Sequence, residues 1–85
     1  MNVGDYICYK LKNELGKIKR VQDDNLVFAW FHTGDTAARI SKDMFDVVLT
    51  NTSAKCVSQE TLIQILREKG FSNDYAIEEI VKKGE

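Results

Sequence analysis

The stretch "NLVFAWFHTGD", residues 25–35, contains six consecutive apolar residues, 26–31, that run directly into a turn sequence. Successive side chains of a β-strand point to opposite faces of the sheet. The run therefore separates into two sets, Val27, Ala29 and Phe31 on one face and Leu26, Phe28 and Trp30 on the other. The first set can fill a core, which makes the second the outer set. The second set must be covered by another part of the chain or left for a partner.

Four further short strands are predicted around this run. Each is rich in β-branched or aromatic residues and is bounded by Gly, Asn, Asp or Thr turn signals. The predicted strands span residues 6–11, 17–21, 36–40 and 46–49, with turns at 13–16, 23–25 and 32–35 and a helical turn at 41–45. Short strands joined by tight turns predict a small barrel or sandwich over residues 1–50.

The second half of the chain has helical periodicity. A polar linker is expected at residues 51–57, after which Ser58 is typical of the N-cap of a helix over residues 59–69. Gly70 fits the left-handed position that ends a helix, and Phe71 is placed to pack back on the last helical turn. Ser72 or Asn73 then caps a second helix, so residues 58–85 are expected to form a helical hairpin.

The hairpin has an apolar stripe on each helix. These stripes consist of Leu62, Ile63, Ile65 and Leu66 in the first helix and Ala76, Ile77, Ile80 and Val81 in the second. Helices shorter than about 12–15 residues are marginal in water by themselves, so the hairpin must dock on the strands. We expect it to cover part of the outer set of the 26–31 strand. The predicted fold is α+β, with residues 1–50 and 58–85 forming one folding unit.

Composition limits the class of protein. The chain has 85 residues, of which 44% are hydrophobic and 29% charged, as in a single folded domain. Twelve Lys and Arg against 13 Asp and Glu give a net charge of -1, so no global field attracts nucleic acid or an anionic membrane. One disulfide is conceivable between Cys8 and Cys56, but we expect reduced thiols in a cytoplasmic protein. No apolar run approaches the ~18–20 residues of a membrane span.

Several short motifs of the first half occur in a familiar order. They are Val3-Gly4-Asp5-Tyr6, Gly16-Lys17-Ile18, Val27-x-Ala29-x-Phe31-x-x-Gly34, Ile40 and Asp46-Val47-Val48. In this order the chain resembles the Src-homology-3-like small barrels of the KOW and Tudor type over roughly residues 3–49. The resemblance implies a five-stranded barrel with a helical turn before the last strand. It also implies binding of RNA, DNA, peptide or methyl-lysine, since this fold serves all four.

Residues that could carry chemistry have simpler explanations. His32 is expected to be a turn residue, and Cys8 a small apolar group within a strand. The carboxylates near turns, whose spacing matches no calcium loop, are Asp23, Asp24, Asp35, Asp43 and Asp46. No nucleophile motif or phosphate-binding loop occurs. We therefore expect no enzyme activity, no cofactor and no metal.

Two sets of residues are candidates for binding. The aromatic set, Trp30, Tyr6, Tyr9 and Phe28, predicts a docking patch for another protein, because Trp and Tyr dominate interface hot spots. The basic set is Lys10, Lys12, Lys17, Lys19 and Arg20, with Glu14 as the only acid among them. It predicts either a nucleic-acid surface or a solvated face that protects a sheet edge. The first expectation is a non-catalytic module that binds a protein partner as a regulator, accessory subunit or inhibitor-like cap; the alternative is KOW-like binding of RNA or DNA.

Overall fold

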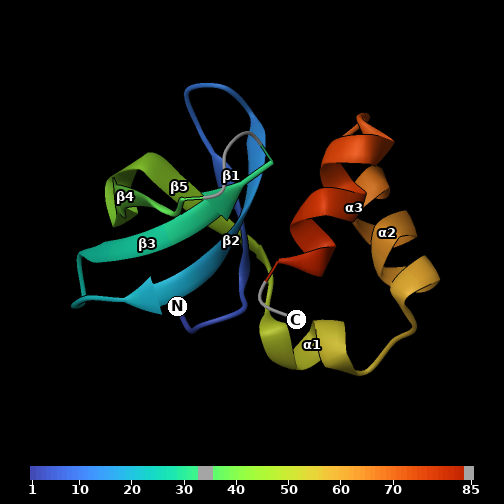
Figure 1. Cartoon of the computed structure of the whole chain (residues 1–85), viewed down its shortest axis with the longest axis horizontal. Coiled ribbons are helices and arrows are strands. Elements are labelled where there is room, and N and C mark those ends of the chain that lie inside the picture. The colour runs from blue at the N-terminus through green and yellow to red at the C-terminus, as the bar shows by residue number, and fades with distance from the viewer. Residues whose placement is uncertain (33–35, 84–85) are drawn as a thin grey trace.

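Residues 1–32 and 36–83 are described by the computed structural model, which has the predicted α+β architecture (Figure 1). A five-stranded antiparallel sheet is followed by helices. The strands are β1 (Tyr6–Tyr9), β2 (Glu14–Val21), β3 (Leu26–Phe31), β4 (Ala38–Ser41) and β5 (Phe45–Leu49), with a 3-10 helix η1 (Lys42–Met44) before β5. The helices are α1 (Asn51–Lys55), α2 (Gln59–Glu68) and α3 (Asp74–Lys82).

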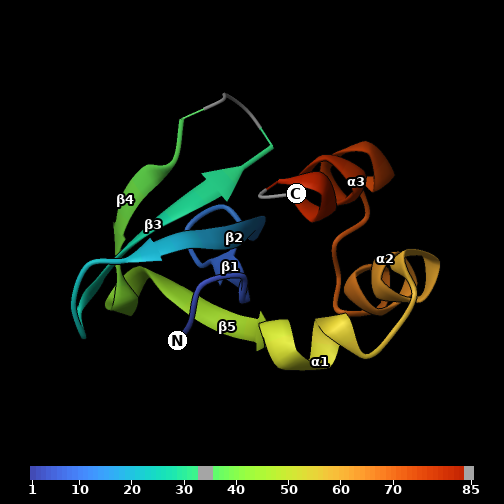
Figure 2. The ribbon, with the colours of Figure 1, turned by 60° about the horizontal axis from the view of Figure 1, so that its bottom comes forward.

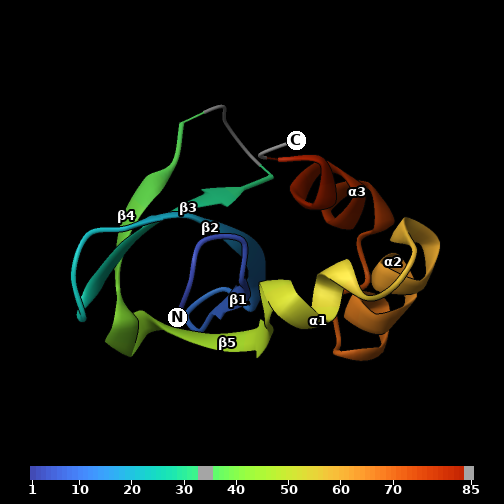
Figure 3. The same cartoon turned by 90° about the horizontal axis from the view of Figure 1, so that it is seen from below.

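The strands are hydrogen-bonded in the order β4-β3-β2-β1-β5. Figure 3 shows that the sheet is strongly curved. Among the described residues no pairing joins β4 to β5, so the hydrogen-bonded sheet does not close on itself. The architecture is an open antiparallel sheet with its two edges at β4 and β5, covered on one side by helices.

One core lies on the concave side of the sheet, and we call it the inner cluster. It consists of Ile7, Ile18, Val27, Ala29, Ile40 and Phe45. The prediction for the first set of the 26–31 run is confirmed, since Val27 and Ala29 are fully buried here and Phe31 packs against the cluster. The outer set of β3 belongs to neither core.

A second core lies between the sheet and the helices, and we call it the helix cluster. It consists of Tyr6 and Leu15 from the sheet and Ala54, Leu62, Leu66, Phe71, Ile77, Ile80 and Val81 from the helical part. The helices therefore dock on the sheet as expected, but on β1 and β2 rather than on the outer set of β3. The reason is connectivity. β5 pairs with β1, so the chain that leaves β5 emerges beside β1, and α2 and α3 lie far from β4 (Figure 2).

The first turn lies earlier in the sequence than predicted. It spans residues 10–13, and Asn13 takes its left-handed position with φ of 49°. The predicted turn at 13–16 is wrong, because Gly16 lies within β2. A Cβ at Gly16 would lie 2.8 Å from Phe31 Cε1 and 3.0 Å from the Trp30 carbonyl oxygen. This glycine therefore permits close approach to β3 rather than a turn.

The predicted linker at residues 51–57 is also wrong, because it contains α1. Thr50 caps this helix by accepting a hydrogen bond from the Ser53 N–H at 3.2 Å. Ala54 is buried in the helix cluster. Five residues are too few to show helical periodicity in the sequence.

The helix ends that local sequence predicts are confirmed. Ser58 accepts from the Thr61 N–H at 3.2 Å, and Asn73, rather than Ser72, accepts from the Ala76 N–H at 3.2 Å. Gly70 has φ of 108° and donates its N–H to the Arg67 carbonyl, one of the hydrogen bonds of a Schellman stop. Phe71 is buried with the last turn of α2.

Candidate functional site

The pairing of β2 with β3 contains a β-bulge beside the predicted basic residues. Ile18 pairs with Ala29, and Arg20 pairs with Phe28, so Lys19 is one extra residue on β2. Strict alternation from the buried Ile18 would turn Arg20 toward the inner cluster. The bulge shifts the register by one residue and brings Arg20 onto the outer face, as bulges commonly redirect side chains.

Two cations lie over the aromatic rings of the outer face. Lys19 Nζ lies 5.6 Å from the centroid of the Trp30 ring, and Arg20 Cζ lies 4.4 Å from the centroid of the Phe28 ring. Each such exposed cation–π contact stabilises its geometry by about 0.5–1 kcal/mol. Both rings are half-buried. The bulge thus places positive charge directly beside aromatic surface.

A third cation extends this surface onto β4. Arg39 is exposed and pairs directly with Phe28, so their side chains lie on the same face. We call Lys19, Arg20, Phe28, Trp30 and Arg39 the basic face. A hollow of about 260 Å³ lies between Lys19, Arg20 and Phe28 on one side and Thr36 and Ala37 on the other.

The basic face has no acidic neighbour within its strands. In β2, β3 and β4 the only carboxylate is Glu14, at the opposite end of β2 from Arg20. Glu14 Oε1 lies 3.6 Å from His32 Nδ1. The local charge of the basic face is therefore positive although the whole chain has a net charge of -1.

Lys17 does not belong to this surface, although it shares the outer side of β2. Its Nζ donates to the carbonyl oxygens of Val81 at 3.3 Å and Lys83 at 2.7 Å. It also lies 5.4 Å from the centroid of the Tyr6 ring. A cation at a helix C-terminus is electrostatically favourable, so Lys17 ties β2 to the end of α3.

The other members of the predicted basic set lie elsewhere. Lys10 and Lys12 are in the turn at residues 10–13, and Lys10 Nζ lies 3.7 Å from Asp46 Oδ1 of β5. Lys12 lines a separate hollow beside Tyr9. The structure therefore brings together only Lys19 and Arg20 of the five predicted basic residues.

The predicted aromatic set is divided in the same way. Tyr6 is only 2% exposed and belongs to the helix cluster. Tyr9 packs on the inner cluster, with its ring centroid 6.1 Å from that of Phe31. Trp30 and Phe28 remain on the outer face. Two of the four predicted aromatic residues and two of the five predicted basic residues thus form one common surface.

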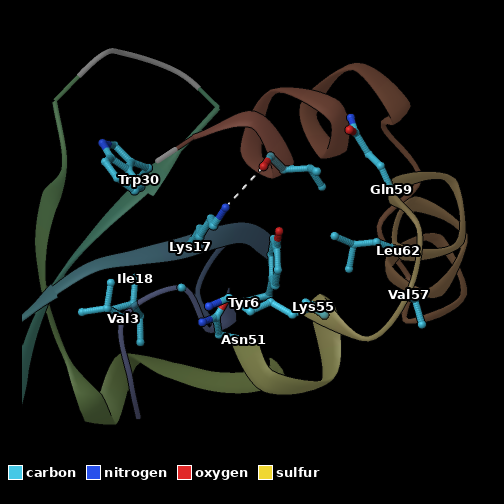
Figure 4. A pocket seen from close by; sticks show the side chains of 13 residues that line it. Val3, Tyr6, Lys17, Ile18, Trp30, Asn51, Lys55, Val57, Gln59 and Leu62 are labelled. Atoms are coloured by element: carbon cyan, nitrogen blue, oxygen red, sulfur yellow. Dashed lines mark hydrogen bonds between the residues drawn. The ribbon is translucent and has the colours of Figure 1, made fainter. Parts of the chain in front are cut away.

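A cleft adjoins the basic face at Trp30. It has a volume of about 460 Å³ and lies between the sheet, α1 and α2. In Figure 4, Trp30 stands on one side of it and Leu62 on the other, with Lys17 and Tyr6 between them. Lys55 of α1 also lines the cleft. Trp30 is therefore common to the cleft and the basic face.

The remaining candidates for chemistry are His32, the two cysteines and the carboxylates near turns. Within residues 1–32 and 36–83, no group of three or more His, Cys, Asp or Glu is arranged to hold a metal ion. Cys8 and Cys56 are free thiols, and burial together with the charge of Asp46 raises the pKa of the Cys8 thiol. Asp23 Oδ1 accepts from the Asn25 N–H at 2.7 Å, as expected of a turn residue. Asp35 lies outside the described residues.

Two residues of the site were not predicted. Arg39 could have been found from alternation, because the buried Ile40 next to it on β4 turns Arg39 outward. Lys55 had no such signal, since its helix of five residues is too short to show helical periodicity. Both are exposed cations, and whether they belong to a binding site depends on which strands and helices lie beside them.

Comparisons with protein-family models, with curated proteins and with solved structures found no match for this chain. No helix in the described part of the chain has the length and apolar character needed to cross a membrane.

Proposed function

We propose that this chain is a non-catalytic binding module and that its basic face binds single-stranded nucleic acid. The observation that supports this is the placement of Lys19, Arg20 and Arg39 around two aromatic rings, on strands whose one carboxylate, Glu14, lies at the far end of β2. The nearest other carboxylates in sequence, Asp23 and Asp24, lie in the turn beyond Arg20. The sequence favoured a protein partner because its charges cancel overall. The local arrangement instead favours a polyanion.

The chemistry of a single strand matches this surface. Phosphates are neutralised by Lys and Arg, and unpaired bases stack on aromatic rings and on guanidinium planes. In a duplex the base faces are already stacked on one another, so Phe28 and Trp30 would have nothing to contact. The Arg20 guanidinium over Phe28 extends the stacking surface outward by one layer.

The sheet topology also supports the proposal. The order β4-β3-β2-β1-β5, with a 3-10 turn before β5, agrees with the resemblance to Src-homology-3-like barrels of the KOW and Tudor type. We propose that the chain is a variant of that barrel with helices added to one side. Fold alone does not assign a ligand, so the basic face carries the functional proposal.

The proposal is tested by fluorescence anisotropy with labelled decanucleotides of uridylate and thymidylate at low salt. The double variant Arg20→Gln/Arg39→Gln should weaken binding by about tenfold or more, since each phosphate contact contributes. The matched control Lys10→Gln/Lys12→Gln removes the same charge at the other end of the β1–β2 hairpin and should leave affinity unchanged. Equal losses in both variants, or no binding by the wild type, would contradict the proposal.

A protein partner remains the second candidate because Trp30 is half-buried where the basic face meets the cleft. Such a partner would be acidic. An acidic peptide that binds more tightly than either decanucleotide, and whose affinity depends on Trp30, would favour this candidate.

A further inference from the structure

The cleft between the sheet and the helices is built from chemically mixed walls. Among its apolar lining residues, Val3 is exposed and Trp30 and Val57 are half-buried, whereas Tyr6, Ile18, Leu62 and Val81 are buried. Among the described residues that line it, Lys17 and Lys55 are charged and none is acidic. These walls suit a ligand with a flat apolar body and an anionic group.

The two lysines have different roles. Lys17 donates to the carbonyls at the end of α3, so its ammonium is held on the protein. Lys55 is exposed at the end of α1, where its side chain reaches the cleft (Figure 4). Lys55 is therefore the cation that can meet an incoming phosphate at the mouth of the cleft.

The cleft is continuous with the basic face. Trp30 lines the cleft, and Lys19 of the basic face lies over the Trp30 ring. A nucleic-acid strand that passes over Phe28 and Trp30 therefore reaches the cleft. On this path it meets no carboxylate of β2 or β3, since Glu14 lies at the far end of β2. The volume of about 460 Å³ lies within the ~300–1,000 Å³ range of small-ligand pockets.

We propose that the cleft holds one nucleotide of the strand bound by the basic face. The base lies against Trp30 and the small exposed edge of Leu62, and Lys55 meets its phosphate. This inference rests on the proposed function and extends it, because it specifies that the bound nucleic acid strand ends or turns at the cleft. The occupant is a nucleobase rather than an acidic side chain because the apolar walls favour a ring.

Two variants probe the cleft without altering the basic face. Lys55→Gln removes the cation, and Gln59→Trp fills the cleft from an exposed position at the start of α2. The matched controls are Lys42→Gln, on η1, and Gln64→Trp, on α2. Both control residues are exposed, and neither lines the cleft.

The experiment measures decanucleotide binding to the full chain by anisotropy. Gln59→Trp should weaken binding roughly tenfold, in line with the stacking free energy of one base, and Lys55→Gln should weaken it by about threefold or more through the loss of a phosphate contact. Both controls should bind as the wild type does. In the NMR spectrum of the wild type, addition of uridine 5′-monophosphate should shift the backbone amide signals of Leu62 and Ala54, which line the cleft.

The outcomes separate the two proposals. Cleft variants that bind normally, together with weak binding by Arg20→Gln/Arg39→Gln, would overturn the cleft inference and leave the proposed function standing. A wild type that binds no oligonucleotide would overturn both. An acidic peptide that shifts Leu62 and Ala54 where uridine 5′-monophosphate does not would also overturn the inference, since the occupant would then be a protein.

Discussion

The ammonium nitrogen of Lys17 lies 2.7 Å from the backbone carbonyl oxygen of Lys83. Sixty-six positions separate these residues in the sequence. The contact joins the middle of β2 to the chain just beyond α3, and a second hydrogen bond to Val81 strengthens it. Lys17 therefore holds the helical part on the sheet rather than serving a ligand.

Replacement of Lys17 by Met should destabilise the fold. Met keeps most of the aliphatic stem but leaves the last carbonyls of α3 without their donor, so we expect a loss of about 1–2 kcal/mol in the free energy of unfolding. Urea denaturation followed by circular dichroism measures this. Lys12→Met, at an exposed position in the turn before β2, is the matched control and should change stability by less than about 0.5 kcal/mol. Equal losses would show that Lys17 has no special role.

Asp5 should be essential for the junction between the strands and α1. It is 3% exposed and accepts from the Asn51 N–H and the Asn2 N–H, both at 2.8 Å. Asp5→Ala leaves both donors without an acceptor and should cost about 2–3 kcal/mol of unfolding free energy. Asp5→Asn retains one acceptor oxygen and should lie between Ala and the wild type. Asp24→Asn, at an exposed turn, serves as the control and should be neutral.

Gly16→Ala should be destabilising although Gly16 has no positive φ. The added methyl would meet the Phe31 ring at 2.8 Å and the Trp30 carbonyl at 3.0 Å. Overpacking of this kind costs roughly 1–3 kcal/mol. Phe31→Leu in the same chain should recover part of the loss, because the ring contact is relieved and the carbonyl contact is not. Thermal melts of the single and double variants provide the measurement, and an absence of any recovery would place the strain elsewhere.

The basic face should show the salt dependence of phosphate contacts. For single strands the logarithm of the affinity falls with the logarithm of salt by about 0.7 per phosphate contact. Arg20→Gln/Arg39→Gln should therefore reduce the slope by about 1.4, whereas Trp30→Leu should weaken binding with little change of slope. Quenching of the single tryptophan by bound oligonucleotide offers an independent signal. An unchanged slope in the double variant would exclude phosphate contacts at these two residues.

The two thiols should differ in reactivity with pH. Burial and the charge of Asp46 raise the pKa of the Cys8 thiol, so at a given pH less of it is thiolate. Cys56 is exposed. Iodoacetamide near pH 8 should label Cys56 first, and both cysteines at similar rates in urea, as mapped by mass spectrometry. The folded state favours the neutral Cys8 thiol. Its contribution to the free energy of unfolding is therefore present below the ordinary thiol pKa of 9.0 and is lost as the pH rises further.

Local signals in the sequence were sufficient for much of the fold. The 26–31 strand, the inward direction of Val27 and Ala29, the Ser58 cap and the stop at Gly70 all follow from residues within one or two turns of each other. The first turn was misplaced because Gly16, a residue type common in turns, was expected to end it, whereas Asn13 ends it with a positive φ. Helix α1 was not predicted because five residues are too few to show helical periodicity.

The candidate site depended on the tertiary structure. Residues far apart in the sequence decide it: the bulge that turns Arg20 outward arises only in the pairing of β2 with β3, and Arg39 reaches Phe28 only through β4. Likewise, Lys17 is not part of the basic face because it donates a hydrogen bond to the Lys83 carbonyl just beyond α3. Tyr6 is buried by the helices that follow β5.

The sequence by itself determined which segments form the strands and the two longer helices and which side of β3 faces a core, because those properties depend on periodicity and on caps formed by near neighbours. Only the tertiary structure decided which charges stand beside the aromatic rings. That choice depends on strand register and on where the chain emerges after β5, and neither is a property of any single segment.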